Sequence, residues 1–419
     1  MAGETADMRH SIDQMSPISL RAFHAIGVTS TFVLAATAVF ALAMNVVMQE
    51  SFGKARLAPV LVALVLLHLM RFGKIRFDRE VALYGIFFIY MLGELFWTVD
   101  ISLARNTLVP AINFLLIMVL FGSLLTYHDS RAVLAGMLTG FLTAALVYTS
   151  LTGFPFRYPA EFSYNAVAVM YLFGLFLALL LGCYNFSKGT ILIVSISLLA
   201  HIVATTSIKT NLGILIGSVV AGIVYFRQFI HLIRQHAISL AVLFCMLGYL
   251  AFSNQFLNQS IQNGVARVSI GIRILQNREN LSGQSSIENR TGWMRDGLAG
   301  WSDNPVFGHG VESFRSTFNI TSHSTPIDLL YNSGLIGLII FYSIFFSVSL
   351  RLLRCTSVAS RNRRLLIVSG LTCFLFITLS GVMHYSSFLA AFLAISISVL
   401  NSDRFVSIDS ETNLRQPQL

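Results

Sequence analysis

Long apolar runs separated by short polar stretches dominate this chain. Runs of about 20 apolar residues are typical of transmembrane helices, because the hydrocarbon core of a bilayer requires a helix of that length. We therefore expect an all-α polytopic membrane protein with about 12 transmembrane helices. The expected spans are residues 24–48, 57–70, 81–97, 107–126, 131–151, 164–184, 189–206, 210–226, 237–253, 328–350, 365–382 and 385–401.

The polar stretches divide the chain into one membrane domain with short flanks. Residues 1–23 form an N-terminal segment, residues 24–401 the membrane domain, and residues 402–419 a polar tail that we expect to be disordered. The longest polar stretch, 254–327, is rich in charge and aromatic residues, which predicts a folded cap over the bundle. Within it, residues 286–302 suit a helix on the membrane surface, with Ser286 as cap and Met294, Leu298 and Trp301 on one face.

Composition supports the membrane assignment. The chain is 55% hydrophobic and 11% charged, whereas a soluble domain carries about 25% charge. The net charge of +9 does not indicate nucleic-acid binding, because the basic residues cluster in short loops between apolar runs. The four cysteines lie outside the long polar stretch, which argues against a disulfide framework or a metal cluster.

Loop charge predicts the orientation of the chain. Loops 71–80, 226–236 and 351–364 are rich in Lys and Arg, so the positive-inside rule assigns them to the cytoplasm. Both termini are then cytoplasmic, and the cap lies on the periplasmic side.

Several cations are expected on the outer side, where this rule does not explain them. Lys209 lies between two spans, and Arg290 lies in the predicted surface helix. Each is explained either as an interfacial or solvated charge, or as a group that binds an anionic lipid headgroup. Arg105, Arg157 and Arg273 are further candidates for a glycan or phosphate path, and Arg105 and Arg157 are equally well explained as interface anchors.

His323 stands just before the span that starts near residue 328. It is either a polar interfacial anchor or a general base, since a neutral imidazole can take a proton from a hydroxyl near pH 7. Asp328 follows closely and could orient it, or could stabilise the helix start through the dipole. Gly308, His309 and Gly310 predict a tight turn in which the histidine is structural. Gly334 and Gly337 are explained by close helix packing.

Other catalytic patterns do not occur in the sequence. There are no paired carboxylates of the glycosidase kind, no H-E-x-x-H and no nucleophile elbow. The histidines are scattered without ligand spacing, so we expect no metal and no cofactor.

Four segments together resemble a known family. His323-Ser324, nine further residues and Gly334-Leu335-Ile336-Gly337 are similar to the H-[N/S/Q]-x9-G-x-x-G signature of bacterial O-antigen ligases and of O-antigen and exopolysaccharide polymerases. ENRTGWMRDGLAGWSDNPVFGHG resembles their R…W…PxxGxG segment. TTSIKTNLG resembles a helix end that usually carries Ser-Arg, and GELFWTVDISLARN resembles a WS-x-D segment.

The resemblance implies a multi-pass enzyme of the bacterial inner membrane. It would move a glycan from undecaprenyl pyrophosphate to an acceptor hydroxyl at the periplasmic face, without metal or nucleotide. The family's catalytic histidine corresponds to His323, and its loop arginine to Arg290. The membrane-end arginine corresponds to Lys209, which keeps the charge but loses the bidentate fork; Arg157 or Arg273 is the alternative for that role.

Three functions remain open at this point. The leading hypothesis is a polymerase of O-antigen or exopolysaccharide repeat units, whose partners are a lipid-linked glycan, an acceptor glycolipid, the membrane and a chain-length regulator. The first alternative is an O-antigen ligase that transfers the glycan to the lipid A core. The alternative of another class is a polysaccharide flippase or transporter, which predicts inverted repeats and charges at mid-membrane.

Overall fold

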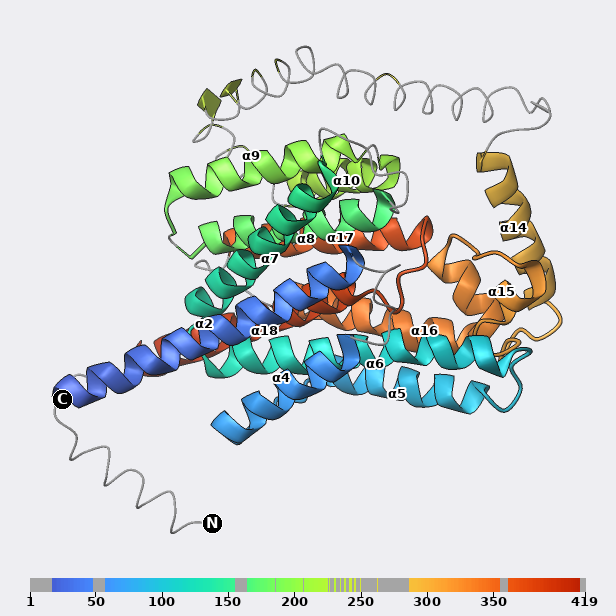
Figure 1. The fold of residues 1–419 in the computed structure, drawn as a ribbon, viewed down its shortest axis with the longest axis horizontal. Coiled ribbons are helices and arrows are strands. Elements are labelled where there is room, and N and C mark those ends of the chain that lie inside the picture. The colour runs from blue at the N-terminus through green and yellow to red at the C-terminus, as the bar shows by residue number, and fades with distance from the viewer. Residues whose placement is uncertain are drawn as a thin grey trace, which may run out of the picture.

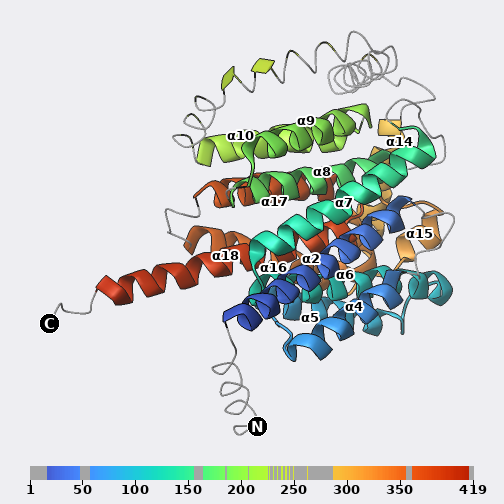
Figure 2. The ribbon, with the colours of Figure 1, turned by 60° about the vertical axis from the view of Figure 1, so that its left-hand side comes forward.

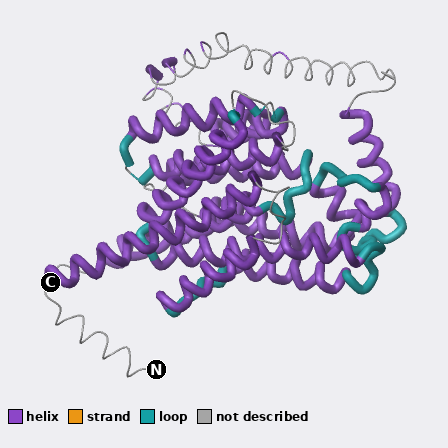
Figure 3. The backbone as a smooth tube through the Cα atoms, in the orientation of Figure 1, coloured by secondary structure: helices purple, strands orange, loops and turns teal. Residues whose placement is uncertain are grey.

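The computed structural model describes residues 17–47, 57–154, 164–184, 186–205, 207–224, 286–354 and 361–414, with isolated positions between 226 and 262. Regular elements in these ranges are all helices (Figure 3), which confirms the all-α prediction there. They are α2 (Pro17–Val47), α4 (Leu57–Phe72), α5 (Arg79–Glu94), α6 (Ile101–Tyr127), α7 (Ser130–Thr152), α8 (Tyr164–Gly182), α9 (Lys188–Ala204), α10 (Ile208–Val224), α14 (Ser286–Trp301), α15 (Ser313–Phe318), α16 (Thr325–Arg354), α17 (Arg361–Leu379) and α18 (Ser387–Leu414).

Six of the described helices are long and apolar enough to cross a membrane. They comprise Gly27–Asn45 of α2, most of α8 from Asn165 to Gly182, and the whole of α6, α7, α16 and α17. Four shorter apolar segments lie in α4, α9, α10 and α18. The expected span 237–253 lies largely outside the described residues. The total of about 12 spans therefore stays a prediction.

The apolar helices form one bundle of roughly antiparallel rods (Figure 1). Seen from the side, α9 and α10 lie over α8 and α17, and α4 and α5 lie at the opposite edge (Figure 2). Helices α2 and α7 cross closely because α7 carries glycines four residues apart. A Cβ at Gly140 would lie 2.0 Å from the Ala36 carbonyl oxygen, and one at Gly136 would lie 2.4 Å from that of Phe32. Small residues in this spacing let helix backbones approach one another in a membrane.

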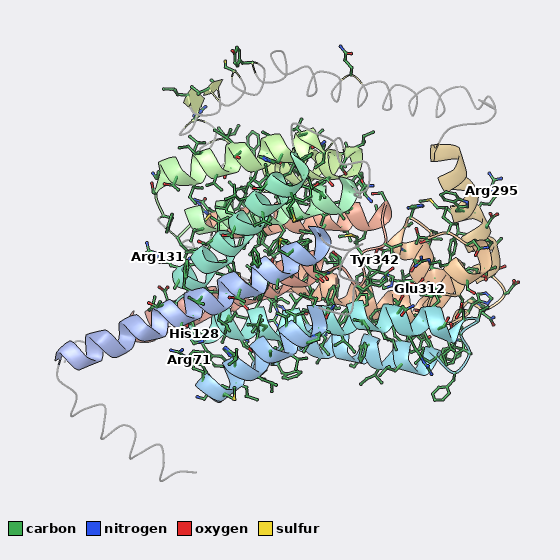
Figure 4. All side chains as sticks on the ribbon, in the orientation of Figure 1. Arg71, His128, Arg131, Arg295, Glu312 and Tyr342 are labelled. Atoms are coloured by element: carbon green, nitrogen blue, oxygen red, sulfur yellow. The ribbon has the colours of Figure 1, made fainter. Side chains whose placement is uncertain are left out.

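The two ends of the bundle differ in charge. Arg71 and Arg131 lie at one end, and Arg295 and Glu312 at the other (Figure 4). At the end with Arg71, Glu80 is fully buried and accepts two hydrogen bonds from the Arg351 guanidinium, at 2.7 and 2.8 Å. The same guanidinium donates to Asn401 on α18. This network joins α5, α16 and α18 at the end that the sequence assigns to the cytoplasm.

Helix α16 is interrupted at Gly334, where φ is 63° and ψ is −165°. The segment 305–310 fills the break. His309 and Gly310 donate backbone hydrogen bonds to the carbonyls of Tyr331 and Asn332, at 2.9 and 2.7 Å. The freed amides of residues 335 and 336 in turn donate to the carbonyls of residues 305 and 306. The bonds lost inside the helix are thus replaced one for one, which a buried backbone requires.

The insertion of this loop explains why positions 308 and 334 are both glycine. Gly308 and Gly334 pack backbone to backbone, since a Cβ at Gly334 would lie 2.2 Å from the Val306 carbonyl oxygen. Close packing of two helices was therefore the wrong explanation for Gly334, which meets a loop. The expected disordered tail was also wrong in part, because α18 continues to Leu414.

Candidate functional site

Helix α14 covers one end of the bundle, and its bounds confirm the predicted helix at 286–302. Its position on the membrane surface stays a prediction. Its contact face consists of glycines. A Cβ at Gly297 would lie 2.7 Å from Ile327, and one at Gly300 would lie 2.5 Å from the Tyr331 ring. Leu298, which we expected on the apolar face, is 44% exposed. The absence of side chains at 297 and 300 allows α14 to lie directly on the start of α16.

His323 lies in the turn between α15 and α16 in the left-handed backbone region, with φ at 55°. Non-glycine residues adopt this conformation seldom, and it occurs more often at functional sites. Two serines beside it hold the turn. The Ser322 hydroxyl donates to the Ser324 carbonyl and to Asp328 Oδ1, both at 2.9 Å. The half-buried imidazole lies 5.4 Å from the Trp293 ring of α14, measured between ring centroids.

The loop between α17 and α18 connects this turn to Lys209. The Thr325 hydroxyl donates to the Gly381 carbonyl at 2.6 Å and accepts from the Met383 amide at 2.8 Å. Lys209 Nζ donates to the Ser380 carbonyl at 3.3 Å. Thr325, two residues after His323, and Lys209 are far apart in the sequence, yet both bind residues 380–383.

A cavity of about 270 Å³ opens beside Lys209. It lies between α2, α6, α8, α10 and the loop that precedes α18. Half of its lining residues are polar. The lining consists of Asn45, Pro110, Asn113, Asn165, Ala166, Val169, Lys209, Gly381, Val382, Met383, Tyr385, Ser386, Ser387 and Phe388.

A buried polar cluster lies between the cavity and the turn. His384 is 4% exposed, and its Nε2 lies 3.8 Å from Asp328 Oδ2. Asn332 also donates to that oxygen, at 3.2 Å. Burial lowers the pKa of His384 to about 3, so the ring is neutral at physiological pH. The pKa of Tyr385 is raised well above its usual value by burial, and further by the charges of Glu312 and Asp328.

The segment that follows α5 binds residues 311–313, which lie directly before and at the start of α15. The Thr98 hydroxyl donates to the Val311 carbonyl at 2.6 Å, and the Val99 amide donates to the Ser313 hydroxyl at 3.3 Å. Glu312 adopts a left-handed conformation and accepts a 2.7 Å hydrogen bond from Thr107 on α6. Asp100 caps α6, and hydrogen bonds from Ser102 and Leu103 lower its pKa. Three of the segments singled out in the sequence thus meet at one place.

The other predicted site residues fall into three groups. Asp328 is buried in the cluster and bonded to Ser322 and Asn332. Arg105 is exposed on α6, in a stretch that we had expected to be a loop. Arg290 lies in α14 with its side chain outside the described part, and Arg157 and Arg273 lie outside the described residues altogether.

Sequence reasoning missed His384, Tyr385, Glu312 and Asn113. None of them belongs to a spaced motif, and Asn113 is a single polar residue between apolar neighbours in the sequence. The available signal was the free-energy cost of burying a polar side chain. A polar residue in an apolar run requires a hydrogen-bond partner or has a functional role. Their convergence depends on packing between distant helices, which the pattern along one run does not encode.

A known protein family matches the part of the chain that carries this geometry. The O-antigen ligase family model matches residues 192–342. This match supports the resemblance to the O-antigen ligase and polymerase superfamily. The matched region runs from α9 to the middle of α16 and includes Lys209, Arg290, His323 and the Gly334 break. No curated protein matches the chain.

The family match and the apolar helices together support a membrane protein of O-antigen and polysaccharide biosynthesis. The two parts of the family signature are also physically linked. The turn at His323 begins α16, and the Gly334 break in the same helix receives the loop 305–310. A histidine and a G-x-x-G pair at this spacing therefore belong to one folded unit.

Proposed function

We propose that this protein is a glycosyltransferase that moves a glycan from undecaprenyl pyrophosphate to an acceptor hydroxyl. The observation that carries the proposal is that the start of α16, two residues after His323, and Lys209 both bind the loop 380–383. His323 and Lys209 themselves both lie in the region that matches the O-antigen ligase family. One group can accept a proton and the other is a cation. Transfer from a lipid pyrophosphate needs both functions at one site.

His323 acts as the general base. Its imidazole takes the proton of the acceptor hydroxyl while the oxygen attacks the anomeric carbon. The bond from that carbon to the pyrophosphate oxygen breaks, and the lipid pyrophosphate leaves with the electron pair. A single displacement inverts the anomeric centre, and it fits a site for which the sequence indicates no carboxylate nucleophile. The left-handed turn and its serine bonds fix the backbone of this base before the substrate binds.

Lys209 and Arg290 bind the pyrophosphate. Negative charge develops on the leaving group as the bond breaks, so fixed cations lower the barrier. Lys209 reaches the cavity from the start of α10. Position 290 lies two helical turns before Gly297 on α14, hence on the side of that helix that faces the start of α16. Arg157, Arg105 and Arg273 are further candidates for the glycan or phosphate path.

The reaction is assigned to the periplasmic face of the inner membrane. Arg71 and Arg131 lie at the end of the bundle opposite Arg295 and Glu312 (Figure 4). The positive-inside rule assigns that end, and both termini, to the cytoplasm.

Polymerisation of repeat units is the leading form of this reaction, with a second lipid-linked glycan as acceptor and a chain-length regulator as partner. Ligation to the lipid A core is the second candidate, because the description of the matching family favours it. The chemistry at His323 is the same for both, and only the acceptor differs.

Deleting the gene and separating the surface glycans on a gel distinguishes these forms. A polymerase predicts loss of long chains while core capped with single units persists. A ligase predicts naked core with accumulating lipid-linked polymer. Lipid-linked units trapped on the cytoplasmic face would contradict both and identify a flippase.

A further inference from the structure

The cavity beside Lys209 contains a buried polar atom without a partner in the protein. Asn113 lies on α6 and is 3% exposed, and no hydrogen-bond partner is present for its Oδ1 among the described residues. A buried acceptor without a partner destabilises the folded protein. A site that binds a ligand explains this cost, because the ligand can supply the missing donor.

The neighbouring groups offer donors. Asn165 Oδ1 accepts a 2.9 Å hydrogen bond from Ser207, which leaves the amide N–H groups of Asn165 for a ligand. Ser207 is held in turn by Thr210 at 3.0 Å, so this amide is fixed in orientation. The cation of Lys209, the amide of Asn45 and three hydroxyls complete the polar part of the lining; the hydroxyls belong to Tyr385, Ser386 and Ser387.

The polar groups that line the cavity indicate the chemical class of the ligand. Lys209 favours an anion such as a pyrophosphate, but a pyrophosphate esterified at both ends carries no O–H group at neutral pH and so has no donor for Asn113 Oδ1. Sugar hydroxyls both donate and accept, and they can satisfy Asn113 and Asn165 together. An isoprenoid chain would leave every one of these polar groups unpaired. The volume of about 270 Å³ is small for a ligand site, which favours one sugar ring over an oligosaccharide.

We infer that this cavity is a subsite for the sugar linked directly to the pyrophosphate, with Asn113 accepting from a ring hydroxyl and Asn165 donating to one. The lipid-linked form of the ligand rests on the function proposed above. The cavity then determines which donor glycans are accepted, and Lys209 marks its phosphate end. Asn113 would be a specificity residue that makes no contact with the pyrophosphate.

The test uses full-length protein in lipid nanodiscs and two probes. One is the undecaprenyl-pyrophosphate-linked repeat unit extracted from the native strain, and the other is bare undecaprenyl pyrophosphate. We expect wild type to bind the glycosylated lipid about 10-fold more tightly, which corresponds to about one good hydrogen bond. Asn113→Leu should reduce this ratio to about 2 without changing the affinity for the bare lipid.

A matched control is Asn106→Leu, which alters an exposed asparagine on the same helix and should keep the 10-fold ratio. Thermal stability provides a second readout. Because Asn113 Oδ1 is unpaired, Asn113→Leu should leave Tm unchanged or raise it.

Three results would overturn the subsite: a wild-type ratio near 1, an unchanged ratio in Asn113→Leu, or an equal loss of affinity for both lipids with a lower Tm. If wild type binds neither lipid, the transfer function itself is refuted. A failure of the proposed subsite can therefore be distinguished from a failure of the proposed transfer function.

Discussion

At the residue scale, the proposed site depends on two polar residues, His323 and Lys209, whose helices start against the same loop. His323 starts α16 and Lys209 starts α10, and residues 380–383 contact both segments. Lys209 occupies the position where the family resemblance implies arginine. An ammonium is a point charge, so it can bind phosphate without the planar fork of a guanidinium.

Lys209 can be tested by charge alone. Lys209→Ala should lower the rate of glycan transfer about 100-fold, because one fixed cation at the leaving group is lost. Lys209→Arg should keep the rate within about 3-fold, since the charge remains. Initial rates with lipid-linked glycan measure both, and Lys188→Ala, an exposed lysine at the start of α9, is the matched control. Equal activity of Lys209→Ala and wild type would remove Lys209 from the mechanism.

His384 predicts a pH dependence of stability. Its pKa is about 3 in the folded protein and about 6.5 in an unfolded chain. Between these values the unfolded state binds a proton that the folded state does not, so folded stability falls as the pH drops below about 6.5. At pH 5 the loss from this residue is about 2 kcal/mol. Asp328 and the Tyr385 ring are the titratable groups that contact it.

The measurement is Tm in detergent at pH 7.5 and pH 5. Wild type should lose several degrees more than His384→Gln, which cannot titrate. The same drop in both proteins would contradict the assignment of a neutral, buried His384.

Individual residues show what the sequence could and could not predict. The position of His323 at the start of a span followed from the polarity pattern. The position of His384 behind it did not, because residue 384 reaches Asp328 only through the packing of three helices. The unpaired Asn113 escaped notice for the same reason, since burial in an apolar run gives no sign of a cavity.

At the element scale, α16 and the loop 305–310 act as one unit. The predicted span 328–350 corresponds to α16. The interruption of this helix at Gly334 was not predictable, because glycine is common in membrane helices. Only the pairing of residues 305–310 with residues 331–336 explains why both segments contain glycines. By contrast, the surface helix at 286–302 was predictable because its cap residue, its composition and the following proline are all local signals.

Gly334→Ala tests this unit. The added Cβ would meet the Val306 carbonyl oxygen at 2.2 Å, and φ at 63° disfavours alanine. We expect a loss of roughly 2–5 kcal/mol of stability, seen as a marked fall in Tm, together with loss of transfer.

Gly93→Ala is the control, because Gly93 lies in α5 and a Cβ there would meet nothing within 4 Å. It should be neutral or slightly stabilising, as expected for alanine in a helix. A Gly334→Ala protein with wild-type Tm would show that the loop insertion does not exist in the membrane.

At the scale of the whole molecule, the bundle has a basic end with Arg71 and Arg131. The proposed catalytic site lies at the opposite end, with Arg295 and Glu312. The general architecture followed from composition, since a chain with so little charge must bury its helices in lipid. The orientation rests on charge statistics and calls for direct measurement.

Labelling of single cysteines from outside the cell measures the orientation of the bundle in the membrane. In a background with the four native cysteines replaced by alanine, Asp303→Cys lies at the catalytic end and Lys74→Cys at the basic end, both at exposed positions. A membrane-impermeant maleimide added to the periplasm should label position 303 and leave position 74 unlabelled until the inner membrane is permeabilised. The reverse pattern would place His323 in the cytoplasm.

The central claim is that His323 takes a proton from the acceptor during glycan transfer. The most direct test reconstitutes purified protein in nanodiscs with lipid-linked repeat units and measures release of undecaprenyl pyrophosphate together with glycan growth or transfer. General-base catalysis contributes about 10²- to 10⁴-fold, so His323→Ala should lower the rate by at least 100-fold while Tm and binding of the lipid stay near wild type. A well-folded His323→Ala protein that turns over at close to the wild-type rate would contradict the account.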